Sequence, residues 1–282
     1  MSVDINDDVD RPTRQALLAS VHRHTGITMT EKKWPLLQGR LRRRLQALSL
    51  DSYRDYLDVL DSRADEATYF IDLVTTNETS FFRTPRIWDY LWQQFLPRWH
   101  NEHAGSILQI WSAAASSGEE AYSLAMLCEE YRERHPAFRY RILATDIAKY
   151  VVGAGEIGLY QGRSIDGLRR SRPAFFEKYF AKIDDRFAVV PALRANVSFR
   201  EHNLYRRLAD PLRIDLVLLR NVLIYFDDAG QQAVVDNVAS SLVPDGVLII
   251  GESESLSRHR TGFDFEQPLI YRKQEAMRER RA

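Results

Sequence analysis

Short apolar runs alternate with helical patterns through the second half of the sequence, and this alternation constrains the fold most. Strands are expected over residues 106–111, 140–145, 215–219 and 247–251, and helices over residues 119–133 and 231–242. A run that is apolar on both faces is typical of a buried parallel strand. Repeated strand–helix–strand units predict an α/β fold with a doubly wound parallel sheet and right-handed crossovers. Residues 263–273 are expected to add one or two strands at an edge.

The first 75 residues carry a helical pattern instead. Apolar residues repeat at spacings of four, four and three, which is one face of a helix: Leu37, Leu41, Leu45 and Leu48. Asp51 and Ser52 are typical of the N-cap region of a following helix over residues 53–60. No convincing strand is found here. We expect a small all-helical N-terminal domain over residues 1–75, a linker over 76–104 and the α/β domain over 105–275.

One stretch interrupts the alternation of the second half. Residues 186–190 and 196–200 are β-rich runs around Pro191. They predict a small antiparallel β-subdomain, at about residues 183–200, inserted into the α/β domain. The alternative is a solvated loop with two edge strands. Residues 276–282 are highly charged and are expected to be a frayed tail.

Composition excludes several classes of protein. The 39 basic and 39 acidic residues balance, which argues against bulk nucleic-acid binding. A single cysteine, Cys128, allows no intrachain disulfide and no cysteine cluster for zinc, and the seven histidines show no metal-ligand spacing, so no metal is expected. No apolar run is long enough for membrane insertion, and the polar start lacks the pattern of a signal peptide. A cytoplasmic protein is therefore expected.

The strongest local feature is the passage from the first strand into the first helix of the α/β domain. Seven small residues, 112–118, lie between them, and small residues allow a ligand to approach the backbone closely. The dinucleotide-binding glycine pattern and the P-loop lysine are both absent, which favours a ligand without phosphates. Glu119, at the start of the helix, suits a cationic ligand. The alternative is a tight turn followed by an ordinary acidic helix start.

Polar residues also follow the next strands. Asp146 ends the second strand, where an acid commonly accepts hydrogen bonds from ribose hydroxyls; the alternative is a helix N-cap. Arg220 and Asn221 follow the third strand, with Tyr225 four residues later in a very apolar run. Buried polar side chains need partners, so these are either a site or a structural pair, and we favour a site.

Two features lie outside the sheet. The segment TTNETSFFR, residues 75–83, joins the two halves, and its density of polar side chains is typical of a pocket lid, the alternative being a capped turn with an aromatic anchor. Arg40, Arg43 and Arg44 lie on one flank of the leucine-rich helix. A basic flank can dock an acidic partner, although a charge run is more often a solvated face.

Six motifs, in a fixed order, together resemble the chemotaxis receptor methyltransferases, the CheR family: TTNETSFFR, WSAAASSGEEAYSLAM, ATDI, HNL, RNVLIYF and PDGVLIIGESE. The resemblance extends from about residue 10 to 272. It implies methyl transfer from S-adenosylmethionine (SAM) to glutamate side chains on the cytoplasmic helical region of chemoreceptors. The products are glutamate methyl esters and S-adenosylhomocysteine (SAH), and the enzyme is recruited to membrane receptor arrays. The implied fold is a helical domain linked to a SAM-dependent α/β domain with a β-subdomain.

The resemblance also implies site residues. The cofactor contacts correspond to Asn77, Thr79, Arg83, Glu119, Asp146, Asn203, Leu204, Arg220 and Asn221. Among them Asp146 holds the ribose hydroxyls, Asn203 and Leu204 lie near the adenine, and Arg220 and Asn221 line the methionine end.

The catalytic pair implied by the resemblance is Arg83 with Tyr225, closest to the reacting centre. Arg40, Arg43 and Arg44 match in character the family's basic helix that recognises the receptor. Some members also bind a receptor C-terminal peptide through the β-subdomain, and the sequence does not decide whether this chain does.

The acceptor chemistry needs no general base. A glutamate carboxylate has an unperturbed pKa of about 4.3 and is ionised at neutral pH, so orientation is expected to dominate catalysis. Three alternative functions fit parts of the sequence: a SAM-dependent methyltransferase acting on RNA or a small molecule, a non-catalytic SAM-binding regulator, and a nicotinamide-dependent oxidoreductase. The first is disfavoured by the neutral charge and the linker motif, and the second by the retained Arg83 and Tyr225. The third is disfavoured by the missing glycine pattern.

Overall fold

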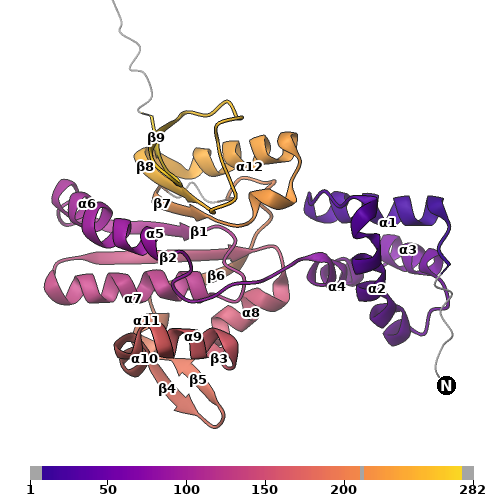
Figure 1. The fold of residues 1–282 in the computed structure, drawn as a ribbon, viewed down its shortest axis with the longest axis horizontal. Coiled ribbons are helices and arrows are strands. Elements are labelled where there is room, and N and C mark those ends of the chain that lie inside the picture. The colour runs from indigo at the N-terminus through magenta and orange to yellow at the C-terminus, as the bar shows by residue number, and fades with distance from the viewer. Residues whose placement is uncertain (1–7, 210–212, 275–282) are drawn as a thin grey trace, which may run out of the picture.

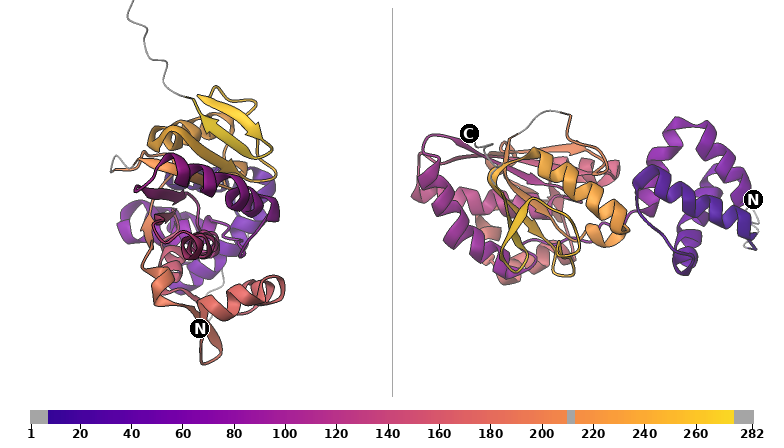
Figure 2. Two further views of the ribbon diagram at one scale, coloured as in Figure 1. Left: turned by 90° about the vertical axis from the view of Figure 1, so that its left-hand side faces the viewer. Right: turned by 90° about the horizontal axis from the view of Figure 1, so that it is seen from above.

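The computed structural model describes residues 8–209 and 213–274. A group of helices stands at one end of the elongated molecule, and a sheet covered by helices makes up most of the rest (Figure 1). The same separation is seen from above in Figure 2. In Figure 1, one irregular segment of chain links the two parts. The expected tail, residues 276–282, lies outside the described residues.

The N-terminal part is helical, as predicted, and residues 8–75 contain no strand. Its elements are α1 (Arg11–Thr25), a short turn η1 (Glu31–Lys33), α2 (Trp34–Leu48), α3 (Tyr53–Ser62) and α4 (Ala64–Val74). Leu37, Leu41 and Leu45 are fully buried in a core of their own, with Leu48 packed at its edge. Ser52 caps α3 by accepting a hydrogen bond from the backbone N–H of Asp55, as its N-cap pattern predicts.

The main sheet has seven strands in the order β6-β2-β1-β7-β8-β10-β9. The parallel strands are β1 (Ile107–Ser112), β2 (Arg139–Asp146), β6 (Val197–Glu201), β7 (Ile214–Leu219) and β8 (Leu242–Ile250). The antiparallel edge consists of β9 (Phe263–Gln267) and β10 (Ile270–Lys273). Strand β1 lies centrally, with Trp111 in register with Leu143 and Val217. The predicted doubly wound sheet and its final edge strands are confirmed.

Helices connect and cover these strands. The longer ones are α7 (Glu119–Arg134), α8 (Lys149–Ile157) and α12 (Asp228–Ser241); η3 (Leu223–Tyr225) is a short turn after β7. The expected linker, residues 76–104, also contains helix: α5 (Pro85–Tyr90), a π-helical turn η2 (Leu91–Phe95) and α6 (Leu96–Glu102). Trp88, Leu91 and Phe95 belong to the large core of the α/β domain. Only the residues before α5 therefore bridge the two parts.

A second, three-stranded antiparallel sheet projects below the main sheet in Figure 1. It has the order β3-β5-β4, with β3 (Leu159–Tyr160), β4 (Phe180–Ile183) and β5 (Arg186–Val189). The helices α9 (Arg163–Ser171) and α10 (Pro173–Tyr179) lie between β3 and β4, and α11 (Pro191–Arg194) follows β5. A small β-subdomain is thus confirmed.

The predicted pairing within that subdomain, residues 186–190 with 196–200, is wrong. Strand β5 pairs with β4 through a tight turn at Asp184, whose φ is +53°. Residues 197–201 form β6, which pairs in parallel with β2 at the edge of the main sheet. The reason is apolar alternation. In β6, Val197 and Phe199 pack against the large core, a contact that they would lose in the predicted hairpin. The subdomain therefore precedes most of the expected range of 183–200.

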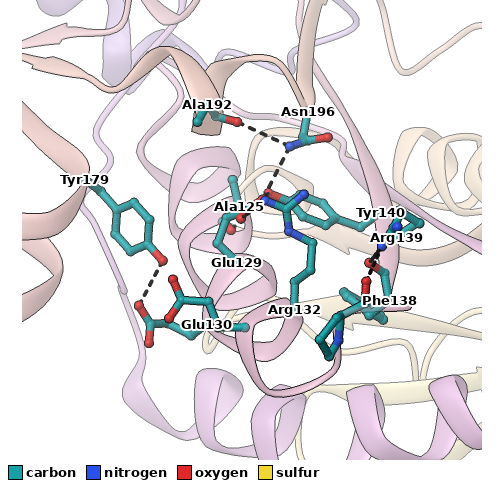
Figure 3. Close-up of polar contacts among 12 residues, drawn as sticks. Ala125, Glu129, Glu130, Arg132, Phe138, Arg139, Tyr140, Tyr179, Ala192 and Asn196 are labelled. Atoms are coloured by element: carbon teal, nitrogen blue, oxygen red, sulfur yellow. Dashed lines mark hydrogen bonds and ion pairs between the residues drawn. The ribbon is translucent and has the colours of Figure 1, made fainter.

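Two glutamates of α7 fasten the subdomain to the main sheet (Figure 3). The Tyr179 hydroxyl donates to Glu130 Oε1 over 2.9 Å. Glu129 Oε1 accepts from the Tyr140 hydroxyl over 2.6 Å and from Asn196 Nδ2 over 3.4 Å. Helix α10, strand β2 and the residue before β6 are thereby all held against α7.

Candidate functional site

One pocket lies at the carboxyl ends of the parallel strands and collects nearly all of the predicted site residues. Its lining includes Asn77, Thr79, Arg83, Asp146, Asn203, Leu204, Arg220, Asn221 and Tyr225. The segment 75–83 and the loop 112–118, both predicted to lie at a ligand, also contribute Thr75, Thr76, Glu78, Ser80, Ala113, Ala114 and Ser116. Lining residues that were not singled out from the sequence are Thr25, Ile27, Glu120, Ile147, His202, Val222 and Phe226. Open α/β sheets bind ligands at this edge.

The loop after β1 forms the floor of the pocket. The backbone N–H of Ala113 donates to Leu218 O, and that of Ala115 donates to Thr145 O, so the loop continues between β7 and β2. Gly118 ends the loop with a φ of +95°, and a Cβ there would lie 2.8 Å from the Phe199 ring. Only glycine satisfies both conditions at this position.

Glu119 was expected to contact the ligand, but the structure does not place it in the pocket. Its carboxylate accepts hydrogen bonds from the hydroxyls of Ser117 and Ser164, at 2.7 and 3.0 Å, and burial raises its pKa. Glu120 lines the pocket instead. Successive helix residues point about 100° apart, so Glu120 faces the pocket while Glu119 faces away from it. The sequence offered two adjacent glutamates and no signal to separate them.

Asp146 combines the two roles that its sequence position suggests. Its Oδ2 accepts from the Ser116 backbone N–H over 2.9 Å, and its Oδ1 accepts from the Ala148 backbone N–H over 3.0 Å. The side chain is buried, and this burial raises its pKa despite these hydrogen bonds. Asn203 similarly accepts from the Tyr205 backbone N–H, which fixes the turn after β6.

Arg220 is buried at the end of β7, with 2% of its side chain exposed. Its Nη1 lies 2.7 Å from Glu120 Oε2, and Ser112 Oγ donates to the other oxygen of Glu120 over 2.7 Å. Its Nη2 donates to Arg83 O and Thr84 Oγ1, at 3.0 and 2.9 Å. Arg220 therefore lies at the pocket, as favoured from the sequence, and its ionic partner is Glu120 and not the neighbouring Asn221.

Glu254 is a supporting residue that sequence reasoning missed. Asn221 has a φ of +58°, and its backbone N–H donates to Glu254 Oε2 over 3.0 Å. The Leu223 backbone N–H donates to Glu254 Oε1 over 2.8 Å. Burial raises the pKa of Glu254. One carboxylate thus shapes the whole turn that carries Asn221 and Tyr225 to the pocket.

The helical domain reaches this pocket as well. Thr25 and Ile27 line it, and the Thr28 backbone N–H donates to Tyr225 O over 2.9 Å. The Lys33 ammonium lies 6.0 Å from the centre of the Tyr225 ring. The pocket therefore lies between the two domains, as the polar linker predicts, although the contributing residues of the helical domain carry no motif.

Tyr205 fastens this junction. Its hydroxyl donates to Gly26 O over 3.3 Å. Gly26 has a φ of +76°, and a Cβ there would lie 2.1 Å from the Tyr205 ring. The close approach of the α1 C-terminus to the α/β domain thus depends on glycine at this position.

The three arginines of α2 differ in their environments. Arg40 Nη1 donates to the backbone oxygens of Leu73, Val74 and Thr75 at the end of α4, over 2.9 to 3.1 Å. Arg44 forms a two-pronged ion pair with the fully buried Glu66, at 2.9 and 2.6 Å. Arg43 is exposed. Only Arg43 of the three therefore presents its charge to solvent in the way a docking surface requires.

The lining chemistry fits a nucleoside ligand that carries positive charge. Glu78, Glu120 and Asp146 supply acids, Arg83 and Arg220 supply the cations, and the lining contains no lysine. Within residues 8–209 and 213–274, no three His, Cys, Asp or Glu side chains are grouped as a metal site requires. In the same residues, no helix has the length and apolar character that crossing a membrane requires.

Known proteins resemble the chain over both domains. Residues 13–75 match the family described as CheR methyltransferase, all-alpha domain, and residues 77–270 match CheR methyltransferase, SAM binding domain. The chemotaxis protein methyltransferase of Borreliella burgdorferi is 31% identical over 278 residues, which cover 95% of this chain and 96% of that protein. That of Listeria monocytogenes is 41% identical, covering 66% and 68%, and that of Escherichia coli is 30% identical, covering 89% and 87%. The chain therefore belongs to the CheR family of SAM-dependent chemotaxis methyltransferases.

Proposed function

We propose that the interdomain pocket binds SAM and presents its methyl group beside Arg83 and Tyr225, where a chemoreceptor glutamate accepts it. The observation that carries this proposal is that three separate elements place the predicted side chains in one pocket. The linker supplies Arg83, the turn after β7 supplies Tyr225, and the end of β2 supplies Asp146 to one pocket. The product on the receptor is a glutamate methyl ester, and SAH remains in the pocket.

The lining residues are assigned to parts of the ligand by their chemistry. Asp146 keeps lone pairs for the ribose hydroxyls beyond the two backbone N–H groups that it already accepts. Asn203 and Leu204 lie beside the adenine, while Asn77, Thr79 and Asn221 surround the methionine end. Glu120 takes the place that the sequence assigned to Glu119, facing the positive end of the ligand. No metal takes part.

The chain's own side chains orient the reaction. SAM supplies an electrophilic methyl group on sulfur, which moves to the carboxylate oxygen as the carbon–sulfur bond breaks. Arg83, exposed at the pocket, holds the acceptor carboxylate or the cofactor by its positive charge. Tyr225, half-buried, fixes the direction of approach. The acceptor is already ionised, so orientation, worth up to about 7–11 kcal/mol, is the main contribution.

Receptor recognition involves the helical domain. We place Arg43, and not Arg40 or Arg44, in contact with an acidic receptor helix, because only Arg43 is exposed. The enzyme acts in the cytoplasm and is recruited to membrane receptor arrays by this contact. Strand β4 is an edge of the small sheet, and its open side offers backbone groups to an extended receptor C-terminal peptide.

Methyl transfer from labelled SAM to chemoreceptor-containing membranes tests the assignment. The wild-type enzyme is expected to label the receptor band, and Arg83→Ala is expected to lower the rate at least about 100-fold with SAH still bound. Arg43→Ala, matched in charge loss, should raise the KM for receptor and leave kcat nearly unchanged. Full activity of Arg83→Ala would refute the proposed site.

A further inference from the structure

The turn that carries Arg83 has an unusual backbone. Phe82 has a φ of +52° and Thr84 a φ of +66°, so both neighbours of Arg83 are left-handed without being glycine. This region disfavours side chains, and β-branched ones such as threonine most of all. Such a conformation persists only where the surroundings impose it.

Three elements impose it here. Ser123 of α7 accepts a hydrogen bond from the Phe82 backbone N–H over 3.0 Å. Trp88 of α5 donates from Nε1 to Arg83 O over 3.0 Å. Arg220, at the end of β7, donates from one nitrogen to both Arg83 O and Thr84 Oγ1. Three consecutive residues of the turn are therefore fixed by groups from three different elements.

The Arg83 side chain is held far less firmly than its backbone. Its guanidinium is exposed, and its hydrogen bond to Glu78 O is long, at 3.4 Å. Its direction thus depends on the turn beneath it. Arg220 is the buried cation of the clamp, and Glu120 neutralises it in the interior. The Thr84 hydroxyl that accepts from Arg220 also donates to Glu252 Oε2 over 3.1 Å. The Arg220 Nε has no hydrogen-bond partner among the described residues, and its two Nη atoms make the contacts to Glu120 and to the turn.

We propose that Arg220 is a positioning residue: it holds the strained turn at residues 82–84 and so aims Arg83 at the reacting centre. Its effect on methyl transfer passes through Arg83 and not through its own contact with the cofactor. This inference rests on the proposed function of Arg83 in the pocket. It also makes a statement about the turn that holds whatever the acceptor is.

Hydrogen exchange, followed by mass spectrometry on the unliganded full-length protein, tests the clamp without using activity. Arg220→Lys keeps the charge beside Glu120 but lacks the second nitrogen, Nη2, which donates to Arg83 O and Thr84 Oγ1. Exchange in peptides covering residues 80–90 should accelerate at least tenfold, while peptides from β1, β7 and β8 stay protected. Arg132→Lys, at an ion pair on α7 away from the turn, is the matched control and should change nothing there. Unchanged exchange in the turn, or loss of protection throughout the sheet, would overturn the proposal.

Thr84 provides a second variant that leaves Arg220 intact. Thr84→Val is nearly isosteric and removes the hydroxyl that accepts from Arg220 and donates to Glu252. It should loosen residues 80–90 and lower kcat, and Thr84→Ser should restore both because the hydroxyl returns. If serine fails to restore protection and rate, the hydroxyl contact is not what holds the turn.

A double-mutant cycle on methyl transfer tests the route of the effect. Arg220→Lys should lower kcat about 10- to 100-fold, since a misplacement of about 1 Å can cost 100-fold, with the Kd for SAH changed less than about threefold. In an Arg83→Ala background the same change should cost less than about twofold, because no cation remains to be aimed. Additive losses together with a raised Kd for SAH would assign Arg220 to direct cofactor contact instead. A wild-type enzyme that methylates no receptor would refute the proposed function, whereas the exchange measurement would still decide the clamp.

Discussion

Arg44 and Glu66 offer the sharpest test of whether α2 is a docking face or a structural element. Glu66 is fully buried, and its carboxylate accepts from both prongs of Arg44 and from the Tyr56 hydroxyl at 2.9 Å. Arg44 also covers the Tyr69 ring at 3.9 Å. The perturbation is Arg44→Met, which keeps the aliphatic stem and removes the charge, leaving Glu66 as a buried carboxylate with a single hydroxyl donor.

The expected loss follows from this geometry. Removing one partner of a buried ion pair costs about 3–5 kcal/mol, because the other charge stays buried without compensation. The Arg44 side chain is 18% exposed, which allows some hydration of the site and places the cost near the lower limit, about 3 kcal/mol. For a helical domain of this size that corresponds to a fall in Tm of about 12 °C or more. A second change, Glu66→Gln, should recover much of it, since the buried charge is gone and the amide oxygen still accepts from Tyr56.

Urea unfolding measures this loss. Trp34 is the one tryptophan in the first 75 residues and is buried, whereas the other four lie at residues 88–111. The part of the fluorescence transition that a Trp34→Phe control removes therefore reports on the helical domain. Arg43→Met removes the same charge from an exposed position of the same helix and should change stability by less than about 0.5 kcal/mol. If Arg44→Met leaves stability within that range while receptor methylation fails, Arg44 is a docking residue and the structural interpretation is refuted.

Three further results are expected. Burial raises the pKa of Asp146 above its usual range. As pH falls toward this raised pKa, the carboxyl becomes protonated and accepts less well from two ribose hydroxyls, so the Kd for SAH, measured by calorimetry, should rise with it, whereas Asp146→Asn should bind weakly with a flat profile. Gly26→Ala should weaken SAH binding several-fold, because Cβ would displace Tyr205 and move the chain that places Thr25 at the pocket; unchanged affinity would mean that the helical domain does not shape the pocket. Tyr225→Phe should lower kcat only modestly, and a steep new pH dependence would contradict its orienting role.

The sequence predicted the sheet well because its signals are local. The parallel strands β1, β2, β7 and β8 each contain a short apolar run, and polar residues that follow β2 and β7, such as Asp146 and Asn221, meet at one edge of the sheet. What failed depends on partners distant in sequence. Residues 197–201 are β-rich in either pairing, and only contact with the large core decides that they join β2.

The roles of charged residues also depend on partners that are distant in sequence. Arg40, Arg43 and Arg44 look equivalent in sequence, yet two of them satisfy groups of α4, and nothing local reveals it. Glu119 and Glu120 differ by one position, so the rotation of α7 against the sheet decides which one lines the pocket. Glu254 ends the motif PDGVLIIGESE and Tyr205 follows HNL, but nothing local reveals their roles, because both act on backbone atoms of residues far along the chain.

The chemical stability of the transferred label tests the central claim most directly. After transfer from methyl-labelled SAM to chemoreceptor-containing membranes, mild base hydrolyses methyl esters and releases volatile methanol, whereas N-methyl products resist it. We predict that the receptor-bound label is released quantitatively as methanol from the wild-type reaction and is absent with Arg83→Ala. Label that survives base would show that the acceptor is not a carboxylate, and the account of an ionised acceptor oriented without a general base would then be wrong.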